Sequence, residues 1–139
     1  MQALIDGKSL FNAQPRLLIA PGHTATQAVA TAIDSVAQKL RAIGIIDGPG
    51  TTDEAAMAYA DNFGSRNLYM VDPGVKYWDT VTSATVDAPG SAWAAGLFDW
   101  TDAEYGFWAS PSNKELTGIT GTGRAVEYLD GDETCRANL

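Results

Sequence analysis

The sequence predicts an α/β fold: a mostly parallel sheet flanked by helices, with an extended β segment near the C-terminus. Short apolar segments bounded by Gly and Pro alternate with longer segments whose apolar residues recur at helical spacing. This alternation is typical of βαβ units, in which helices cover a parallel sheet. The length of 139 residues suits one domain, so we expect residues 1–139 to form a single α/β domain.

The first half of the chain shows the alternation most clearly. Leu17–Ala20 is predicted to be a strand, because it is apolar and closes on a Pro-Gly turn. A helix follows, capped by Thr24 or Thr26 and running to about Ala42. Its apolar residues recur at helical spacing and predict one core-facing stripe: Val29, Ile33, Val36 and Leu40. Residues 43–46 are the second predicted strand.

A second strand–helix unit follows at once. Thr51 and Glu54 have the spacing of a capping box and predict the start of a helix that continues to Phe63. Gly64 is expected to end this helix in the left-handed conformation. Residues 68–71 are the third predicted strand.

The later part of the chain gives weaker patterns. Residues 75–86 interleave β-branched and aromatic residues with polar ones, which predicts extended structure. Residues 91–100 predict a helix with Trp93, Leu97 and Trp100 on one face. We expect residues 119–128 to form a strand or extended arm, and Asp132 to cap a terminal helix.

Composition restricts the classes of partner. The net charge is −8 and there is no cluster of basic residues, so we expect no nucleic-acid binding and no binding to anionic lipid. The longest apolar runs are much shorter than the ~18–20 residues of a membrane span. A single cysteine excludes an internal disulfide.

The residue types that could perform catalysis do not form a complete pattern. The turn at residues 47–52 joins a strand to a helix, but it lacks both the dinucleotide and the P-loop glycine patterns. Its acidic residues favour a plain helix-entry turn over an anion site. His23 and Cys135 could form a nucleophile pair, although an ordinary loop histidine and an ordinary cysteine explain them better. We therefore predict no catalytic and no cofactor-binding residues.

A metal site is not predicted either. One histidine and one cysteine cannot make a zinc site. The acidic run at residues 130–133 lacks the ligand spacing of a calcium loop.

Aromatic residues are dense between positions 93 and 108. Six of them could form part of the core, a protein–protein face or a site that stacks a small molecule: Trp93, Phe98, Trp100, Tyr105, Phe107 and Trp108. Such density most often belongs to a core, and we expect Trp108 to be a buried anchor beside a turn. That turn is Ser110-Pro111-Ser112-Asn113, in which proline fixes φ and the polar side chains bond nearby backbone.

The same region carries the most specific motif of the chain. Its key residues are Trp108, Ser110, Pro111, Ser112, Asn113, Gly118, Gly121, Thr122 and Arg124. In this order they resemble the contractile tail sheath protein of tailed bacteriophages and R-type pyocins. Residues 15–22, 45–49 and 132–139 are similar to that family as well, so the resemblance covers almost the whole chain. Ala109, Gly123 and Ala125 depart from the family pattern.

The resemblance implies a structural role and no enzyme activity. It implies a fragment of a longer sheath subunit that polymerises around the tail tube protein and contracts to drive the tube through the bacterial envelope. Neighbouring sheath subunits, six per layer, would be its partners, joined by exchanged terminal strands. The location implied is the virion or a phage-tail-like particle, assembled in the bacterial host cytoplasm. The alternative that the residues leave open is a flavodoxin-like or hydrolase-like enzyme or ligand-binding domain.

Overall fold

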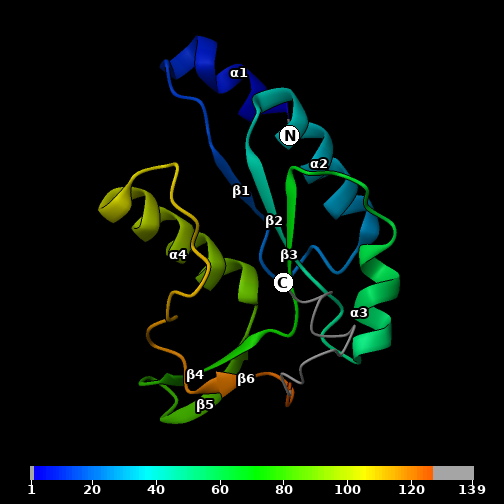
Figure 1. Ribbon diagram of the computed structural model, residues 1–139, viewed down its shortest axis with the longest axis vertical. Coiled ribbons are helices and arrows are strands. Elements are labelled where there is room, and N and C mark those ends of the chain that lie inside the picture. The colour runs from blue at the N-terminus through cyan, green and yellow to red at the C-terminus, as the bar shows by residue number, and fades with distance from the viewer. Residues whose placement is uncertain (1, 127–139) are drawn as a thin grey trace.

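The computed structural model describes residues 2–126 and shows a mixed α/β fold with two small sheets (Figure 1). The first sheet has the strand order β1-β2-β3 and is parallel throughout. The second has the order β5-β4-β6 and is antiparallel. The prediction of a mostly parallel sheet therefore holds for the first sheet and is not confirmed for the fold as a whole.

The parallel sheet consists of β1 (Leu17–Ile19), β2 (Ile43–Asp47) and β3 (Leu68–Val71), which confirms the three strands expected there. Its central strand β2 is buried from Gly44 onwards, because helices cover both faces of the sheet. Close packing requires glycine at position 44, because a Cβ there would lie 2.7 Å from Cγ2 of Ile33.

Three helices cover the parallel sheet. The helices α2 (Gln27–Leu40) and α3 (Asp53–Ala60) lie on one side of it, and α4 (Gly90–Tyr105) lies on the other (Figure 1). The helix α4 contacts all three strands, whereas α2 contacts β1 and β2. This gives a helix–sheet–helix arrangement, the usual solution for a parallel sheet whose strands are apolar on both faces.

The main core lies between α2 and the sheet. Ile33, Val36 and Leu40 of the predicted stripe are buried, and Val29 is partly buried against them. They pack with Leu18 and Ile46 from the strands. Each fully buried aliphatic side chain contributes about 1.5–3 kcal/mol, so the stripe is a major source of the stability of the fold.

Two details of the helix termini differ from expectation. Thr52, not Thr51, caps α3, since its hydroxyl accepts a hydrogen bond of 3.2 Å from the amide of Ala55. The helix ends at Ala60, and Gly64 does not have the left-handed conformation. The side-chain amide of Asn62 instead donates to carbonyl groups of the last turn, which ends the helix without a glycine.

The sequence patterns gave no prediction for α1 (Gln2–Phe11), which packs against α2. Leu10 and Phe11 at its end are exposed. The helix lacks a continuous buried stripe, and periodicity therefore does not reveal it.

The second sheet lies at one end of the molecule (Figure 1). The strands β4 (Val75–Asp79) and β5 (Ala84–Ala88) form a hairpin, which confirms the extended structure expected for residues 75–86. The Asp79 carboxylate accepts hydrogen bonds from Thr82 Oγ1 at 2.7 Å and Val81 N at 3.0 Å in the turn. The Thr82 hydroxyl is the main cause that lowers the pKa of Asp79.

The third strand of this sheet, β6, comprises only Gly121–Thr122. The longer strand or arm expected at 119–128 is thus not confirmed. The helix expected at Asp132 lies outside the described residues.

Candidate functional site

The motif residues lie on one continuous segment, residues 106–124, which we name the strap. It leaves the end of α4, returns along that helix to the second sheet and reaches the carboxyl-terminal end of the parallel sheet (Figure 1). It therefore connects three parts of the fold that are far apart in the sequence.

The strap begins with an exposed aromatic pair. The ring centroids of Phe107 and Trp108 lie 5.2 Å apart in an edge-to-face arrangement. Gly106 adopts a φ of +97°, and a Cβ there would lie 2.5 Å from Cη2 of Trp108. The Trp108 ring thus packs on the Gly106 backbone, while 83% of Phe107 and 76% of Trp108 remain exposed. The expectation that Trp108 is a buried anchor is wrong.

The physical reason is the turn at Gly106. This glycine, whose positive φ other residues rarely adopt, turns the chain at the end of α4 before the two rings can reach the buried face of that helix. The result is an ordered pair of aromatic side chains on the surface. Tryptophan is enriched among the interface residues that contribute most to binding energy.

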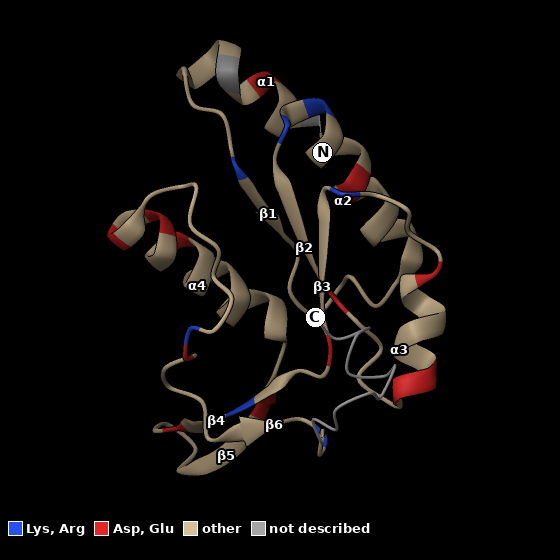
Figure 2. Cartoon of the chain, viewed as in Figure 1, with Lys and Arg blue, Asp and Glu red and all other residues tan. Residues whose placement is uncertain are grey.

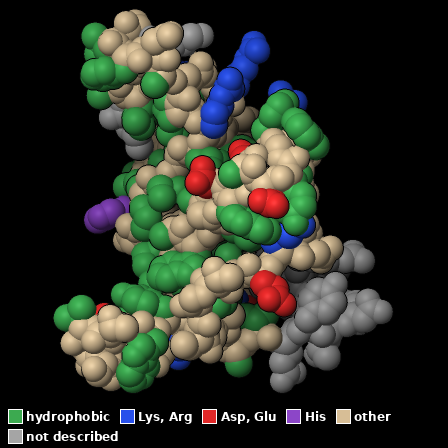
Figure 3. Space-filling view, turned by 90° about the vertical axis from the view of Figure 1, so that its left-hand side faces the viewer, with side chains coloured by type: hydrophobic (Ala, Val, Ile, Leu, Met, Phe, Trp, Pro, Cys, Tyr) green, Lys and Arg blue, Asp and Glu red, His purple; other side chains and the backbone are tan. Residues whose placement is uncertain are grey.

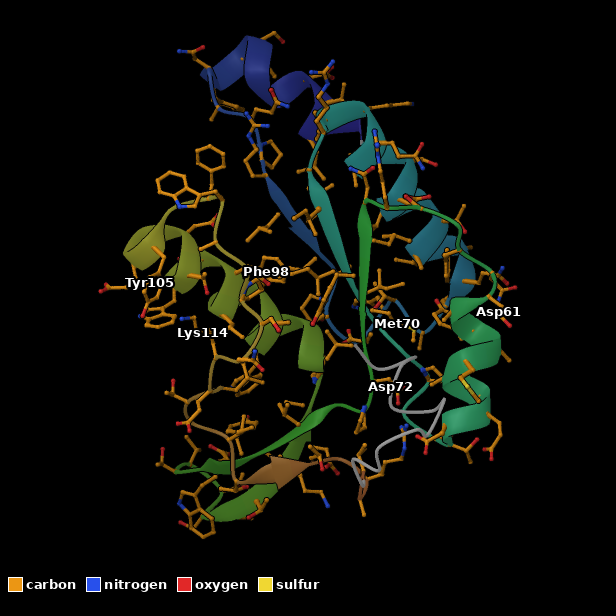
Figure 4. All side chains as sticks on the ribbon, in the orientation of Figure 1. Asp61, Met70, Asp72, Phe98, Tyr105 and Lys114 are labelled. Atoms are coloured by element: carbon orange, nitrogen blue, oxygen red, sulfur yellow. The ribbon has the colours of Figure 1, made fainter. Side chains whose placement is uncertain are left out.

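The other aromatic residues of this region form separate pairs. Phe98 contacts Tyr69 of β3 with the ring centroids 5.4 Å apart, on the side of α4 that packs against the sheet (Figure 4). Trp93 contacts Tyr77 of β4 at 5.3 Å. The six residues therefore do not make the single core cluster that we expected.

The Ser-Pro-Ser-Asn turn is present. Ser110 Oγ accepts a hydrogen bond of 3.2 Å from the amide of Ser112, with Pro111 between them. Asn113 has a φ of +58°, a conformation that asparagine tolerates better than most residues. Local hydrogen bonding and the fixed φ of proline explain the turn, as the sequence predicted.

The strap next forms one wall of a groove. The Lys114 ammonium lies 4.0 Å from the ring centroid of Tyr105, which joins the strap to the end of α4 (Figure 4). Beyond it, a hollow of about 870 Å³ separates residues 113–117 from the face of α4 that carries Leu97 and Trp100. The predicted face of α4 therefore exists, but this groove leaves it only partly covered.

Backbone hydrogen bonds join the strap to β4 and to Gly74, the residue before it. Thr120 N donates to Lys76 O at 2.7 Å, and Gly123 N donates to Gly74 O at 2.7 Å. Gly118 precedes this contact with a φ of +81°. Gly121 and Thr122 are the two residues of β6.

Arg124 ends the strap in an ion-pair cluster. Its guanidinium donates to Asp72 Oδ1 and to Asp53 Oδ1, while Asp72 Oδ2 also accepts a hydrogen bond of 2.6 Å from Gly50 N. The Asp72 side chain is fully buried and that of Arg124 is 16% exposed. Burial alone would lower the pKa of Arg124, but the bonds to Asp72 and then Asp53 raise it above its ordinary value.

Asp47 is the centre of a second polar cluster. Its buried carboxylate accepts hydrogen bonds from Ser91 N and Oγ at 2.8 Å each and from Gly22 N and Thr24 Oγ1 at 3.2 Å each. Thr24, which we considered as a helix cap, is buried and bonded here instead. Asp47 therefore joins β2 to the loop before α2 and to the first turn of α4.

The sequence reasoning missed Asp47 and Asp72 as structural centres. A signal was available, because each aspartate directly follows an apolar strand and precedes a Gly or Pro turn. The carboxyl ends of parallel strands meet at one edge of a sheet, so the two residues lie at the same edge. With Asp53 nearby, this edge is acidic, which disfavours a phosphate at the 47–52 turn.

Two candidates for chemistry remain, His23 and Cys135. His23 is exposed in a loop, and Cys135 lies outside the described residues. Within residues 2–126, no three or more His, Cys, Asp or Glu side chains are grouped so that they could hold a metal ion. No helix in that part of the chain is long and apolar enough to cross a membrane.

Comparison with known proteins gives consistent matches. Residues 1–139 match the family described as phage tail sheath protein central domain. A protein described as a prophage major tail sheath protein of Pseudomonas aeruginosa (strain UCBPP-PA14) is 74% identical over 139 residues, which are 100% of this chain and 36% of that protein. The tail sheath protein of Escherichia phage P2 is 39% identical over 127 residues, 91% of this chain and 32% of that protein.

A third relative extends the pattern. The tail sheath protein of Burkholderia phage BcepMu is 34% identical over 147 aligned positions, covering 100% of this chain and 31% of that protein. The chain therefore spans about a third of the length of the relatives it matches.

Proposed function

The chain belongs to the phage tail sheath protein family, whose central domain it matches from end to end, and on this premise we propose that it is a structural module of a contractile tail sheath. In this role it polymerises, as part of a longer subunit, around a tail tube and takes part in the contraction that drives the tube through a bacterial envelope. The match over residues 1–139 is the observation that carries the proposal.

The fold is suited to this mechanical role. A contractile polymer needs modules that move as rigid bodies on flexible connections. The parallel sheet is covered by helices on both faces, and the clusters around Asp47 and Asp72 join its carboxyl-terminal edge to α4 and to the strap. Forces applied to the strap would therefore be transmitted to the whole domain.

The finer parts of the proposal concern assembly. Neighbouring sheath subunits, six per layer, and the tail tube protein are the proposed partners. The proposed location is the virion or a phage-tail-like particle, after assembly in the host cytoplasm. Residues 1–139 form one domain of the subunit, and the strap residues from Trp108 to Arg124 shape a surface for contacts.

We further propose that the domain has no enzyme activity. The polar clusters of the described residues consist of carboxylates satisfied by backbone amides, hydroxyls and Arg124. Such satisfied groups stabilise a fold and leave no nucleophile–base pair for catalysis. The flavodoxin-like or hydrolase-like alternative has no specific observation in its favour.

Electron microscopy of the longer subunit tests the proposed function. We expect striated tubes or sheaths when the subunit is expressed and purified. Only dispersed particles under all conditions that keep the protein folded would contradict the proposal.

A thermal-shift panel tests the enzyme alternative in parallel. A ligand present at 100 times its dissociation constant would stabilise the fold by about 2.7 kcal/mol. We expect no reproducible shift with nucleotides, divalent metals or common cofactors, and a shift specific to one class would favour the alternative.

A further inference from the structure

A hollow at the amino-terminal end of the parallel sheet combines arginine and aromatic side chains. Its volume is about 530 Å³, and its lining includes Arg16 and Arg41 from the strand starts together with Phe98 and Phe107. Figure 2 shows basic residues near the amino-terminal ends of β1 and β2, whereas acidic residues predominate over most of the chain. We name Arg16, Arg41 and Phe107, with the adjoining Trp108, the arginine–aromatic edge.

The residues of this edge have locally unfavourable conformations or surroundings. Arg41 follows α2 in the left-handed conformation, with φ 52° and ψ 42°, where glycine is the usual residue. Arg16 and Arg41 are both exposed, and within residues 2–126 neither forms an ion pair. Phe107 and Trp108 are exposed but held in place by Gly106 and by one another. Side chains that break local rules without local compensation are expected at functional surfaces.

The last turns of α4 carry negative charge, which is also locally unfavourable. Asp99, Asp102 and Glu104 are exposed there, and the last turn has no basic residue. Carboxylates at this end oppose the helix dipole, and Asp99 and Asp102 repel each other at a spacing of three residues. In the described part of the chain, none of the three forms an ion pair. A cationic partner would relieve both penalties.

The two surfaces are neighbours. Asp102 lines the same hollow as Arg16 and Arg41, but no ion pair joins it to either arginine. On the side of the molecule where α4 lies, hydrophobic side chains form groups between scattered acidic ones (Figure 3). Patches of opposite charge, with exposed aromatic rings beside them, complement the corresponding patches of a neighbouring copy, so that the basic patch of one copy meets the acidic patch of the next in a head-to-tail contact.

We propose that this surface docks a second copy of the chain, with Arg16 and Arg41 of one copy facing Asp99 and Asp102 of the other. The exposed Phe107 and Trp108 supply the apolar contact at its centre. This inference rests on the proposed function, since it names the surface through which neighbouring sheath modules meet.

Charge reversal in the 139-residue chain provides the test. The edge variant carries Arg16→Glu and Arg41→Glu, and the helix variant carries Asp99→Lys and Asp102→Lys. Sedimentation velocity at concentrations up to about 1 mM measures the association of each variant and of an equal mixture of the two. We expect weak association of the wild type, at least about tenfold weaker association of each variant, and recovery in the mixture.

A matched control has the same change in net charge elsewhere. Lys39→Glu with Arg66→Glu alters two exposed basic residues outside the edge, and we expect association within about threefold of the wild type. Circular dichroism and melting temperature show that each variant is folded. A control that weakens association as much as the edge variant would overturn the proposal.

The mixture distinguishes contacts between copies from contacts within one chain. Only contacts between copies are restored when the two variants meet, so a mixture that stays monomeric overturns the proposal. A wild-type chain that stays monomeric at every concentration also overturns the proposal. Tubes formed by the longer subunit would then leave the sheath role intact, whereas their absence would count against that role alone.

Discussion

The core beneath α2 and the strap are held together by different interactions. In the core, Ile33 and Ile46 are almost completely buried, and apolar packing holds them. In the strap, Phe107 and Trp108 are exposed, and the segment is held by hydrogen bonds, a cation–π contact and the ion pairs of Arg124. Periodic apolar residues therefore encode folding, while the dense motif largely encodes a shaped surface.

The largest effect should come from the core. Ile33→Ala removes a side chain that is 2% exposed and leaves a cavity between α2 and the sheet. We expect the free energy of unfolding to fall by about 2–5 kcal/mol in a denaturant titration. A loss below about 1 kcal/mol would mean that the core collapses around the gap or is less tightly packed than its burial indicates.

The Asp47 cluster should come next. Asp47→Ala leaves the Ser91 amide and the Thr24 hydroxyl without their buried acceptor, so we expect a loss of about 3 kcal/mol. Asp87→Ala is the matched control, because Asp87 is exposed on β5, and it should change stability by less than about 0.5 kcal/mol. Equal effects of the two substitutions on thermal unfolding would show that the cluster does not stabilise the fold.

The end of the strap should contribute less than either. Arg124→Ala leaves the buried Asp72 carboxylate with one described hydrogen bond, from Gly50 N, and we expect a loss of about 2 kcal/mol. Hydrogen exchange should then speed up at the amides of Thr120 and Gly123, which bond to Lys76 of β4 and to Gly74 before it. Unchanged exchange at these amides would indicate that the strap is held without Arg124.

The smallest effect on stability is expected for the exposed ring. Trp108→Ala removes a side chain that is 76% exposed, so the denaturant midpoint should shift by less than the equivalent of about 0.5 kcal/mol. A loss of about 3–5 kcal/mol, the usual range for a buried aromatic residue, would show that Trp108 is part of the core.

The sequence predicted those parts of the fold in which burial is periodic. The strands at 17–19, 43–47 and 68–71 and the helix α2 follow from apolar spacing, because packing of a sheet against helices requires it. The helix α1 was missed because its exposed Leu10 and Phe11 interrupt any buried stripe. Pairing of β4 with Gly121–Thr122 joins residues more than 40 positions apart, which local patterns do not encode.

The sequence predicted the residues of the candidate site better than it predicted their positions in the fold. Arg124 was selected through the family resemblance, and its partners Asp72 and Asp53 emerged only from the folded chain. Trp108 was misplaced because a large aromatic side chain favours burial on average, whereas the turn at Gly106 directs this one to the surface. A preference of residue type cannot reveal such a turn.

Assembly of a variant that folds normally tests whether the strap surface serves assembly rather than folding. The longer subunit would carry Phe107→Ser and Trp108→Ser, with Leu10→Ser and Phe11→Ser as a control pair of exposed residues on α1. Electron microscopy and thermal unfolding would be recorded on the same samples. We expect wild-type stability in all of them, tubes from the wild type and the control, and loss of tubes from the strap variant. Normal tubes from a folded strap variant would contradict it.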